Sequence, residues 1–208
     1  MHAWRKVAGI ALALSCTASA PARAQLGLRP GVTVAGGIGI PAAPDDFKNL
    51  HGAGVALSAG LHFKVAPLVG ATLEAGYYRL PFDAGAYEAT LPAPFRSVNV
   101  SGNDLFVIPV TLAAEVSLLP FGSTRPFASA GAGFYRIGTT DAVLSGPGSN
   151  EAPRPQDSSD NALGVRLGLG VRTPLTPLAS FFLDATYHLA FTDPDRIGFV
   201  VGRAGVRF

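Results

Sequence analysis

Cysteine is almost missing from this sequence, since Cys16 is the only one among 208 residues. It lies within an N-terminal segment that has the pattern of an export leader, so we expect the mature chain to contain no thiol. Without cysteine, the sequence excludes disulfide frameworks, thiol nucleophiles and cysteine-ligated metal centres together.

Charged residues are scarce, at 14% of the chain, and long apolar runs are missing beyond the leader. A bundle of spanning helices is excluded, because each helix needs about 20 predominantly apolar residues. The absence of a Gly-X-Y period and of long polar tracts excludes collagen and a largely disordered chain. The 25 glycines disfavour helices, because glycine destabilises a helix interior. A β-rich protein of one domain remains.

The first 24 residues have the three parts of a signal peptide. Arg5 and Lys6 supply positive charge, and an apolar segment follows at 7–14. The tripeptide Ala-Arg-Ala at 22–24 is a small-x-small cleavage site. We therefore expect residues 1–24 to be removed on export.

Cleavage would leave residues 25–208 as the mature domain. Loss of the three basic residues of the leader changes the formal charge from +2 to −1, which removes the support for nucleic-acid binding. A lipoprotein leader ending at Cys16 is an alternative, although Ala13 fits that signal poorly.

The mature sequence contains eight β-rich segments separated by turn signals. They are longer than the five or six residues of a typical soluble strand and match the roughly 9 to 11 tilted residues that cross a membrane. The predicted strands lie near 30–40, 53–65, 69–81, 104–118, 125–138, 161–173, 179–191 and 197–208.

The connections alternate between short turns and longer loops, which is typical of outer-membrane barrels. A soluble sandwich has no reason to keep its long loops at one end. The short connections are 66–68, 119–124 and 174–178; the long ones are 82–103 and 139–160, with 41–52 intermediate. Only 192–196 departs from the pattern, because it is short where a long loop is expected.

Alternation with a period of two assigns a lipid face and a lumen face to each strand. In the seventh segment, for example, Leu183 and Ala185 alternate with Asp184 and Thr186. The segment 125–138 is ambiguous, because either face could point outward. Closure leaves no unpaired strand edge in lipid, so we predict an all-β, eight-stranded antiparallel transmembrane β-barrel.

The lumen face carries a small number of ionisable side chains. An eight-stranded barrel is only wide enough for side chains to fill it, so we expect these charges to neutralise one another as a plug. A gated, slightly anion-preferring pore is the alternative. The predicted cluster consists of His62, Glu74, Glu115, Asp184, Arg203, Arg166 and Arg172, with Lys64 and Arg207 on the same face.

Six outward aromatic residues fall near the two ends of the predicted strands. Two aromatic girdles at the membrane interfaces are expected of a transmembrane barrel. The alternative is that they are core residues of a soluble sandwich. They are Phe63, Phe181 and Phe208 near the short turns, and Tyr77, Phe106 and Phe191 near the long loops.

Two segments resemble a known family. The terminal Gly-Val-Arg-Phe at 205–208 resembles the signal read by the outer-membrane assembly machinery, which would recognise Phe208. The segment RPFASAGAGFY at 125–135 resembles the Pro-aromatic-x-x-x-Gly-x-Gly-x-Tyr strand of small barrels in the OmpA/OmpX-like superfamily. The resemblance implies a Gram-negative outer membrane with lipid as a neighbour, and it brings no shared catalytic site.

Enzymatic motifs are scarce. His51, His62 and His188 form no metal-spaced pair on one strand. Some small outer-membrane barrels are lipid-modifying hydrolases whose catalytic Ser and His lie two apart on a strand, but here Ser58 lies four residues before His62. We predict no catalytic residue, metal or cofactor, while a Ser/His/Asp site assembled across strands stays an alternative.

The sequence therefore favours a non-enzymatic, structural or surface-interaction role. Loops 82–103 and 139–160 would face an extracellular partner of unknown identity. A narrow channel for ions or small solutes and a lipid-modifying hydrolase are the two alternatives.

Overall fold

The computed structural model describes residues 30–92, 99–119, 122–146, 159–193 and 195–208. The predicted signal peptide at 1–24 lies outside these residues. Parts of both long loops, at 93–98 and 147–158, also lie outside them.

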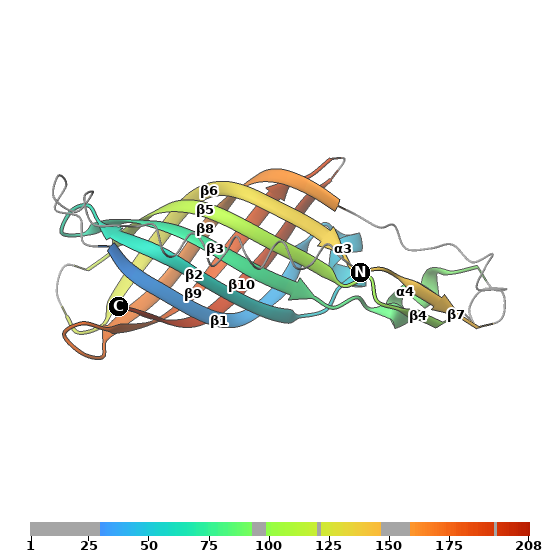
Figure 1. The fold of residues 1–208 in the computed structure, drawn as a ribbon, viewed down its shortest axis with the longest axis horizontal. Helices are drawn as coiled ribbons and strands as arrows, with labels where there is room; N and C mark the ends of the chain where they lie inside the picture. Colours follow the sequence, from blue (N-terminus) through green and yellow to red (C-terminus); the bar gives the residue numbers. More distant parts are fainter. Residues whose placement is uncertain (1–29, 93–98, 120–121, 147–158, 194) are drawn as a thin grey trace, which may run out of the picture.

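Eight antiparallel strands close into a barrel in the order β1-β10-β9-β8-β6-β5-β3-β2, so the predicted fold class is confirmed (Figure 1). The observed bounds differ from the predicted ones by a few residues at the strand ends. The strands are β1 (Pro30–Ala43), β2 (Gly54–Lys64), β3 (Val69–Leu80), β5 (Leu105–Ser117), β6 (Arg125–Thr139), β8 (Ser159–Pro174), β9 (Ser180–Phe191) and β10 (Arg196–Arg207).

Pairing of β1 with β10 closes the wall. Thr33 lies opposite Arg207 and Gly37 opposite Arg203. A side chain at position 37 would collide with the carbonyl oxygen of Gly202, which explains a glycine within this strand. Within the Gly-rich segment at 36–39, Gly37 thus serves close packing of backbones.

The predicted inside–outside alternation is confirmed along the strands. Leu57 and Leu167 are exposed on the outer face, whereas Arg166 and Thr186 are buried inside. The ambiguous strand β6 is settled as well: Phe134 points outward and its neighbour Tyr135 is buried in the lumen.

The long connections contain regular structure that the sequence did not predict. Helix α3 (Asp45–Leu50) follows β1, and its Phe47 is buried against the aromatic core at that end of the barrel. Helix α4 (Ala84–Thr90) begins after Asp83, whose carboxylate accepts a hydrogen bond from the Ala86 amide. None of the described helices is long and apolar enough to cross a membrane.

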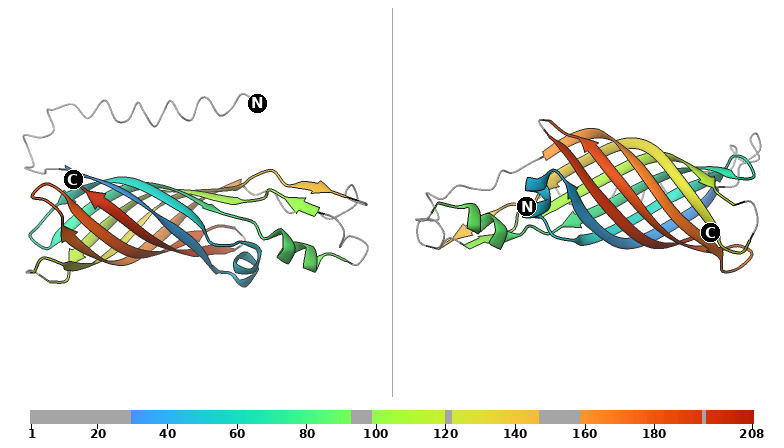
Figure 2. Two further views of the ribbon diagram at one scale, coloured as in Figure 1. Left: turned by 90° about the horizontal axis from the view of Figure 1, so that it is seen from below. Right: turned by 180° about the vertical axis from the view of Figure 1, so that it is seen from behind.

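Two short strands join the long loops. β4 (Asn99–Ser101), from the loop after β3, pairs with β7 (Val143–Ser145), from the loop after β6. With α4 they form an arm that projects from one end of the barrel in every view (Figures 1 and 2). The chain ends at Phe208 at the opposite end, beside the short turns.

Candidate functional site

The lumen contains a buried ionic network centred on Glu74. Its Oε1 accepts hydrogen bonds from Arg166 Nη1 at 2.7 Å and from Arg203 Nη1 at 2.6 Å. Arg203 also donates to both oxygens of Asp184, from Nε at 2.9 Å and from Nη2 at 2.6 Å. The Arg203 side chain is only 1% exposed, so these carboxylates take the place of water.

This network ties together strands that are not neighbours in the wall. Arg203 on β10 lies directly opposite Asp184 on β9, but Glu74 reaches across the lumen from β3. Ser58 Oγ accepts a further bond from Arg203 Nη1 at 3.0 Å, and Thr111 Oγ1 accepts one from Arg166 Nη1 at 3.2 Å. Six strands therefore contribute to one connected set of hydrogen bonds.

A second network, nearer the short turns, is centred on Glu115. Arg172 Nη1 lies 2.9 Å from Glu115 Oε1, and Arg207 Nη2 lies 2.8 Å from Oε2. His62 joins neither network, because its Nδ1 lies 3.0 Å from Thr72 Oγ1. The structure thus brings the three predicted carboxylates into contact with arginines, and leaves the predicted His62 outside.

An aromatic layer fills the lumen toward the long loops, and sequence reasoning missed it. The imidazole of His188 stacks on Phe199 with ring centroids 5.0 Å apart, and its Nδ1 lies 2.9 Å from the Tyr135 hydroxyl. Tyr78 packs edge-on against His188 and Phe199, with ring centroids 5.5 and 5.7 Å apart, respectively. The strand alternation could have indicated it, because Tyr78 directly follows the outward Tyr77 and must therefore point into the lumen.

Little space remains between these layers. The cavity enclosed by the ionic network has a volume of about 20 Å³. This is room for about one water molecule. The described side chains therefore fill the middle of the lumen.

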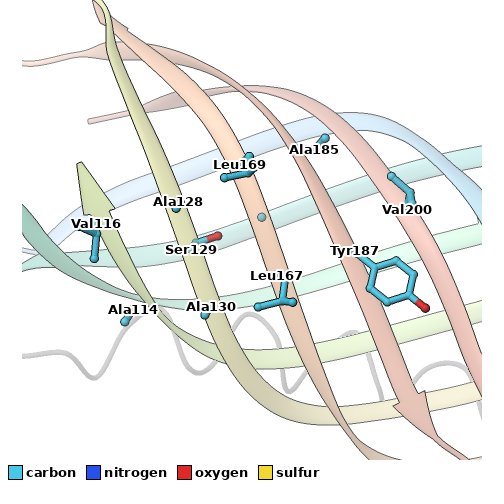
Figure 3. A pocket seen from close by; sticks show the side chains of 11 residues that line it. Ala114, Val116, Ala128, Ser129, Ala130, Leu167, Leu169, Ala185, Tyr187 and Val200 are labelled. Carbon is cyan, nitrogen blue, oxygen red and sulfur yellow. The ribbon is translucent and has the colours of Figure 1, made fainter. Parts of the chain in front are cut away.

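A larger hollow lies instead on the outer wall and measures about 590 Å³. It is formed where alanines on adjacent strands leave space between exposed leucines (Figure 3). Ser129 and Tyr187 are its lining residues with polar side chains, and the Ser129 hydroxyl is buried. It offers no acid–base pair, and its outward position exposes it to membrane acyl chains. Its lining consists of Ala114, Val116, Ala128, Ser129, Ala130, Leu167, Gly168, Leu169, Ala185, Tyr187 and Val200.

A histidine-based catalytic site is a further candidate. The ring nitrogens of His51, His62 and His188 contact the Phe47 carbonyl, Thr72 and Tyr135, respectively. Within the described ranges, no serine forms a hydrogen bond with a histidine, and no three metal-ligating side chains cluster. The described residues therefore give no support to the serine–histidine alternative or to a metal centre.

A second candidate site is the arm, which is anchored to the barrel rim by Asp104. The Asp104 carboxylate accepts bonds from Arg79 Nη2 at 2.6 Å and from the Phe82 amide at 2.9 Å. Its own amide donates to Thr140 Oγ1 at 2.9 Å, which links the loop after β3 to the loop after β6. The two loops, predicted as separate segments, are therefore one structural unit.

The six predicted interface aromatics lie in two groups at opposite ends of the outer face. Phe208 is 65% exposed at the short-turn end, while Tyr77 is 43% and Phe191 44% exposed near the long loops. Phe63, Phe106 and Phe181 are half-buried on the same face. Their role as membrane-interface anchors stays a prediction.

Comparisons with known proteins agree with this architecture. A family model described as an outer membrane protein beta-barrel domain matches residues 8–208. The crystal structure of Neisserial surface protein A is similar over 86% of this chain and 95% of that one, at 14% identity and a TM-score of 0.55. OprG from Pseudomonas aeruginosa is similar over 87% and 97%, at 12% identity and 0.52. No curated protein sequence matches this chain.

The two structural likenesses concern the fold alone at such low identity, while the family model spans nearly the whole chain. Together they confirm the resemblance to small barrels of the OmpA/OmpX-like superfamily. The chain belongs to the family of outer-membrane β-barrel domains and resides in the bacterial outer membrane.

Proposed function

We propose that this protein is a non-enzymatic surface barrel that presents the arm to an extracellular partner while its lumen stays closed. The observation that carries the proposal is the joining of two long loops into one arm by the β4–β7 pair. Long loops of outer-membrane barrels face outward, so the arm would extend beyond the lipid headgroups.

The arm has internal packing of its own, which supports a binding role. Val100 and Leu91 are buried within it, and Glu88 Oε1 accepts a hydrogen bond from the Val100 amide at 3.0 Å. Val143, in contrast, is 59% exposed on the paired strand. A surface held in one shape loses less conformational entropy on binding than two independent loops would.

The closed lumen supports this assignment over transport. Ionic and aromatic layers fill the barrel, and conduction would require breaking several buried ion pairs. A narrow channel is the second candidate, because paired side chains in the lumen can move apart and open a path.

The proposal includes two further partners. Lipid would cover the outer wall, and the assembly machinery would recognise Phe208.

Adhesion of cells that produce the full chain tests the binding role. Val100→Asp places a charge in the buried side of the arm, whereas Ser145→Asp places the same charge on its exposed side. We expect Val100→Asp to abolish adhesion to immobilised proteins or polysaccharides, as would deletion of 82–103 or 139–160. Ser145→Asp is the matched control and should retain adhesion.

Two results would count against the proposal. Adhesion that survives both loop deletions would show that the arm is not the binding surface. Discrete conductance steps from the folded protein in a planar bilayer would favour the channel instead. A heat-shifted gel band should accompany each variant to show that the barrel has folded.

A further inference from the structure

The periplasmic mouth of the barrel, beside the short turns, has an unusual surplus of positive charge. Four cationic side chains face this mouth from four strands of the wall: Lys64 on β2, Arg125 on β6, Arg172 on β8 and Arg207 on β10. Among the described residues that line its two cavities, only Glu115 has a carboxylate side chain. Phe208 also lines one of these cavities.

Glu115 cannot neutralise this set. Its two oxygens are already shared between Arg172, at 2.9 Å, and Arg207, at 2.8 Å. In the described part of the chain, Lys64 and Arg125 have no ion pair at all. The acidic residues of the central network lie deeper and are paired with Arg166 and Arg203.

The four cationic side chains line two cavities at this mouth. One cavity of about 150 Å³ is bounded by Lys64, Arg125 and Arg172, together with the turn at 66–69. A second, of about 300 Å³, is bounded by Lys64, Arg207 and the turn at 176–180. His62 and Lys64 line both, so the cavities form two halves of one vestibule. The filled lumen above makes this vestibule blind.

One buried donor also lacks a partner. The Nε of Arg207 is buried and forms no hydrogen bond, although its side chain is 11% exposed and lines the vestibule. A cleft that is lined by one sign of charge concentrates ions of the opposite sign. Guanidinium groups match the oxygens of phosphate and carboxylate groups, and lysine supplies a compact charge beside them.

We propose that the periplasmic vestibule binds a phosphate-type oxyanion, with Lys64 and Arg125 as the principal ligands and Arg172 and Arg207 as supporting donors. The anion would supply the negative charge that Glu115 alone cannot. Because the lumen is filled above the vestibule, this is a binding site and not the entrance of a conduction path. The same phosphate chemistry could come from a soluble periplasmic ligand or from an inner-leaflet lipid headgroup.

Binding of inorganic phosphate to the full-length protein tests the site, measured by phosphorus NMR in micelles of an uncharged maltoside at low salt. We expect saturable binding at one site. Lys64→Gln combined with Arg125→Gln should weaken it at least about tenfold, because two charge-assisted bonds are lost. Neither side chain forms an ion pair with a described residue, and both lie at the mouth, so the barrel should still fold and show its heat-shifted band.

Lys48→Gln is the matched control, since Lys48 is an exposed lysine on α3 at the other end of the barrel. It should leave phosphate affinity unchanged. Absence of saturable phosphate binding, or an equal loss in Lys48→Gln, would overturn the proposal.

The source of the anion is decided by repeating the titration in nanodiscs. Phosphate binding that persists in both phosphatidylcholine and phosphatidylglycerol discs indicates a soluble ligand. Binding that persists in phosphatidylcholine but disappears in phosphatidylglycerol indicates that an anionic headgroup occupies the vestibule. Either result supports the oxyanion site and identifies its occupant.

Discussion

Arg203 is the side chain on which the central network depends most. Replacing it by Met removes the guanidinium that pairs with both Glu74 and Asp184, while it keeps most of the volume. Glu74 retains Arg166, but Asp184 has no other ion-pair partner among the described residues. Breaking a buried pair by removing one partner costs about 3 to 5 kcal/mol. We expect Arg203→Met to lower the free energy of unfolding by that amount.

The assay is reversible urea unfolding in lipid vesicles, followed by circular dichroism and by the heat-shifted gel band. The double variant Arg203→Met/Asp184→Asn separates a lost attraction from a stranded charge. Since the neutral amide needs no counter-ion, the double variant should recover about half or more of the loss. The Asp184→Asn single variant completes the cycle.

A small effect would refute this reasoning. If Arg203→Met costs less than about 1 kcal/mol, the value typical of exposed pairs, then water must reach the network and the lumen is not closed at this depth. An unchanged loss in the double variant would show that the cost comes from packing and not from the unpaired Asp184.

Four shorter predictions concern other parts of the molecule. If the channel alternative holds, Arg203→Ala should raise single-channel conductance in a planar bilayer, and an unchanged conductance in the folded variant would exclude Arg203 as the gate. Phe208→Ala should reduce the amount of heat-shifted protein in outer-membrane fractions, since the assembly signal would be lost. Asp104→Asn should speed amide exchange in α4 relative to the barrel strands, because its ion pair with Arg79 is removed. Burial lowers the pKa of His51 below 6.5, so the unfolded state binds more protons than the folded state as the pH falls below that value. The protection of amides around α3, corrected for the intrinsic exchange rate at each pH, should therefore fall there in the wild type but not in His51→Gln.

The barrel was predictable because each strand repeats one simple pattern. Apolar residues at every second position, as at Leu183 and Ala185, are sufficient to assign the two faces. The pattern failed at β6, because Ala128, Ala130 and Gly131 are small on both faces and leave no contrast to read. The direction of Tyr135 therefore emerged only from the fold.

The pairing within the lumen was beyond the sequence for a different reason. Alternation places Glu74 and Arg166 inside, but their contact depends on strand register and on the barrel diameter. The sequence did not predict the arm, because β4 and β7 have only three residues each and are far apart in the sequence. Such short strands carry no readable period of their own.

Pairing of the first strand with the last has a consequence for biogenesis. Val32 and Phe208 exchange backbone hydrogen bonds at 2.8 and 3.0 Å, so the final ladder joins residues separated by nearly the whole chain. Before β1 pairs with β10, each of these strands has a row of backbone amides and carbonyls without hydrogen-bond partners, and hydrocarbon cannot supply those partners. A partly inserted intermediate with these two strands unpaired is therefore unstable in lipid. Another protein would have to pair with the edges of β1 and β10 until the two strands join.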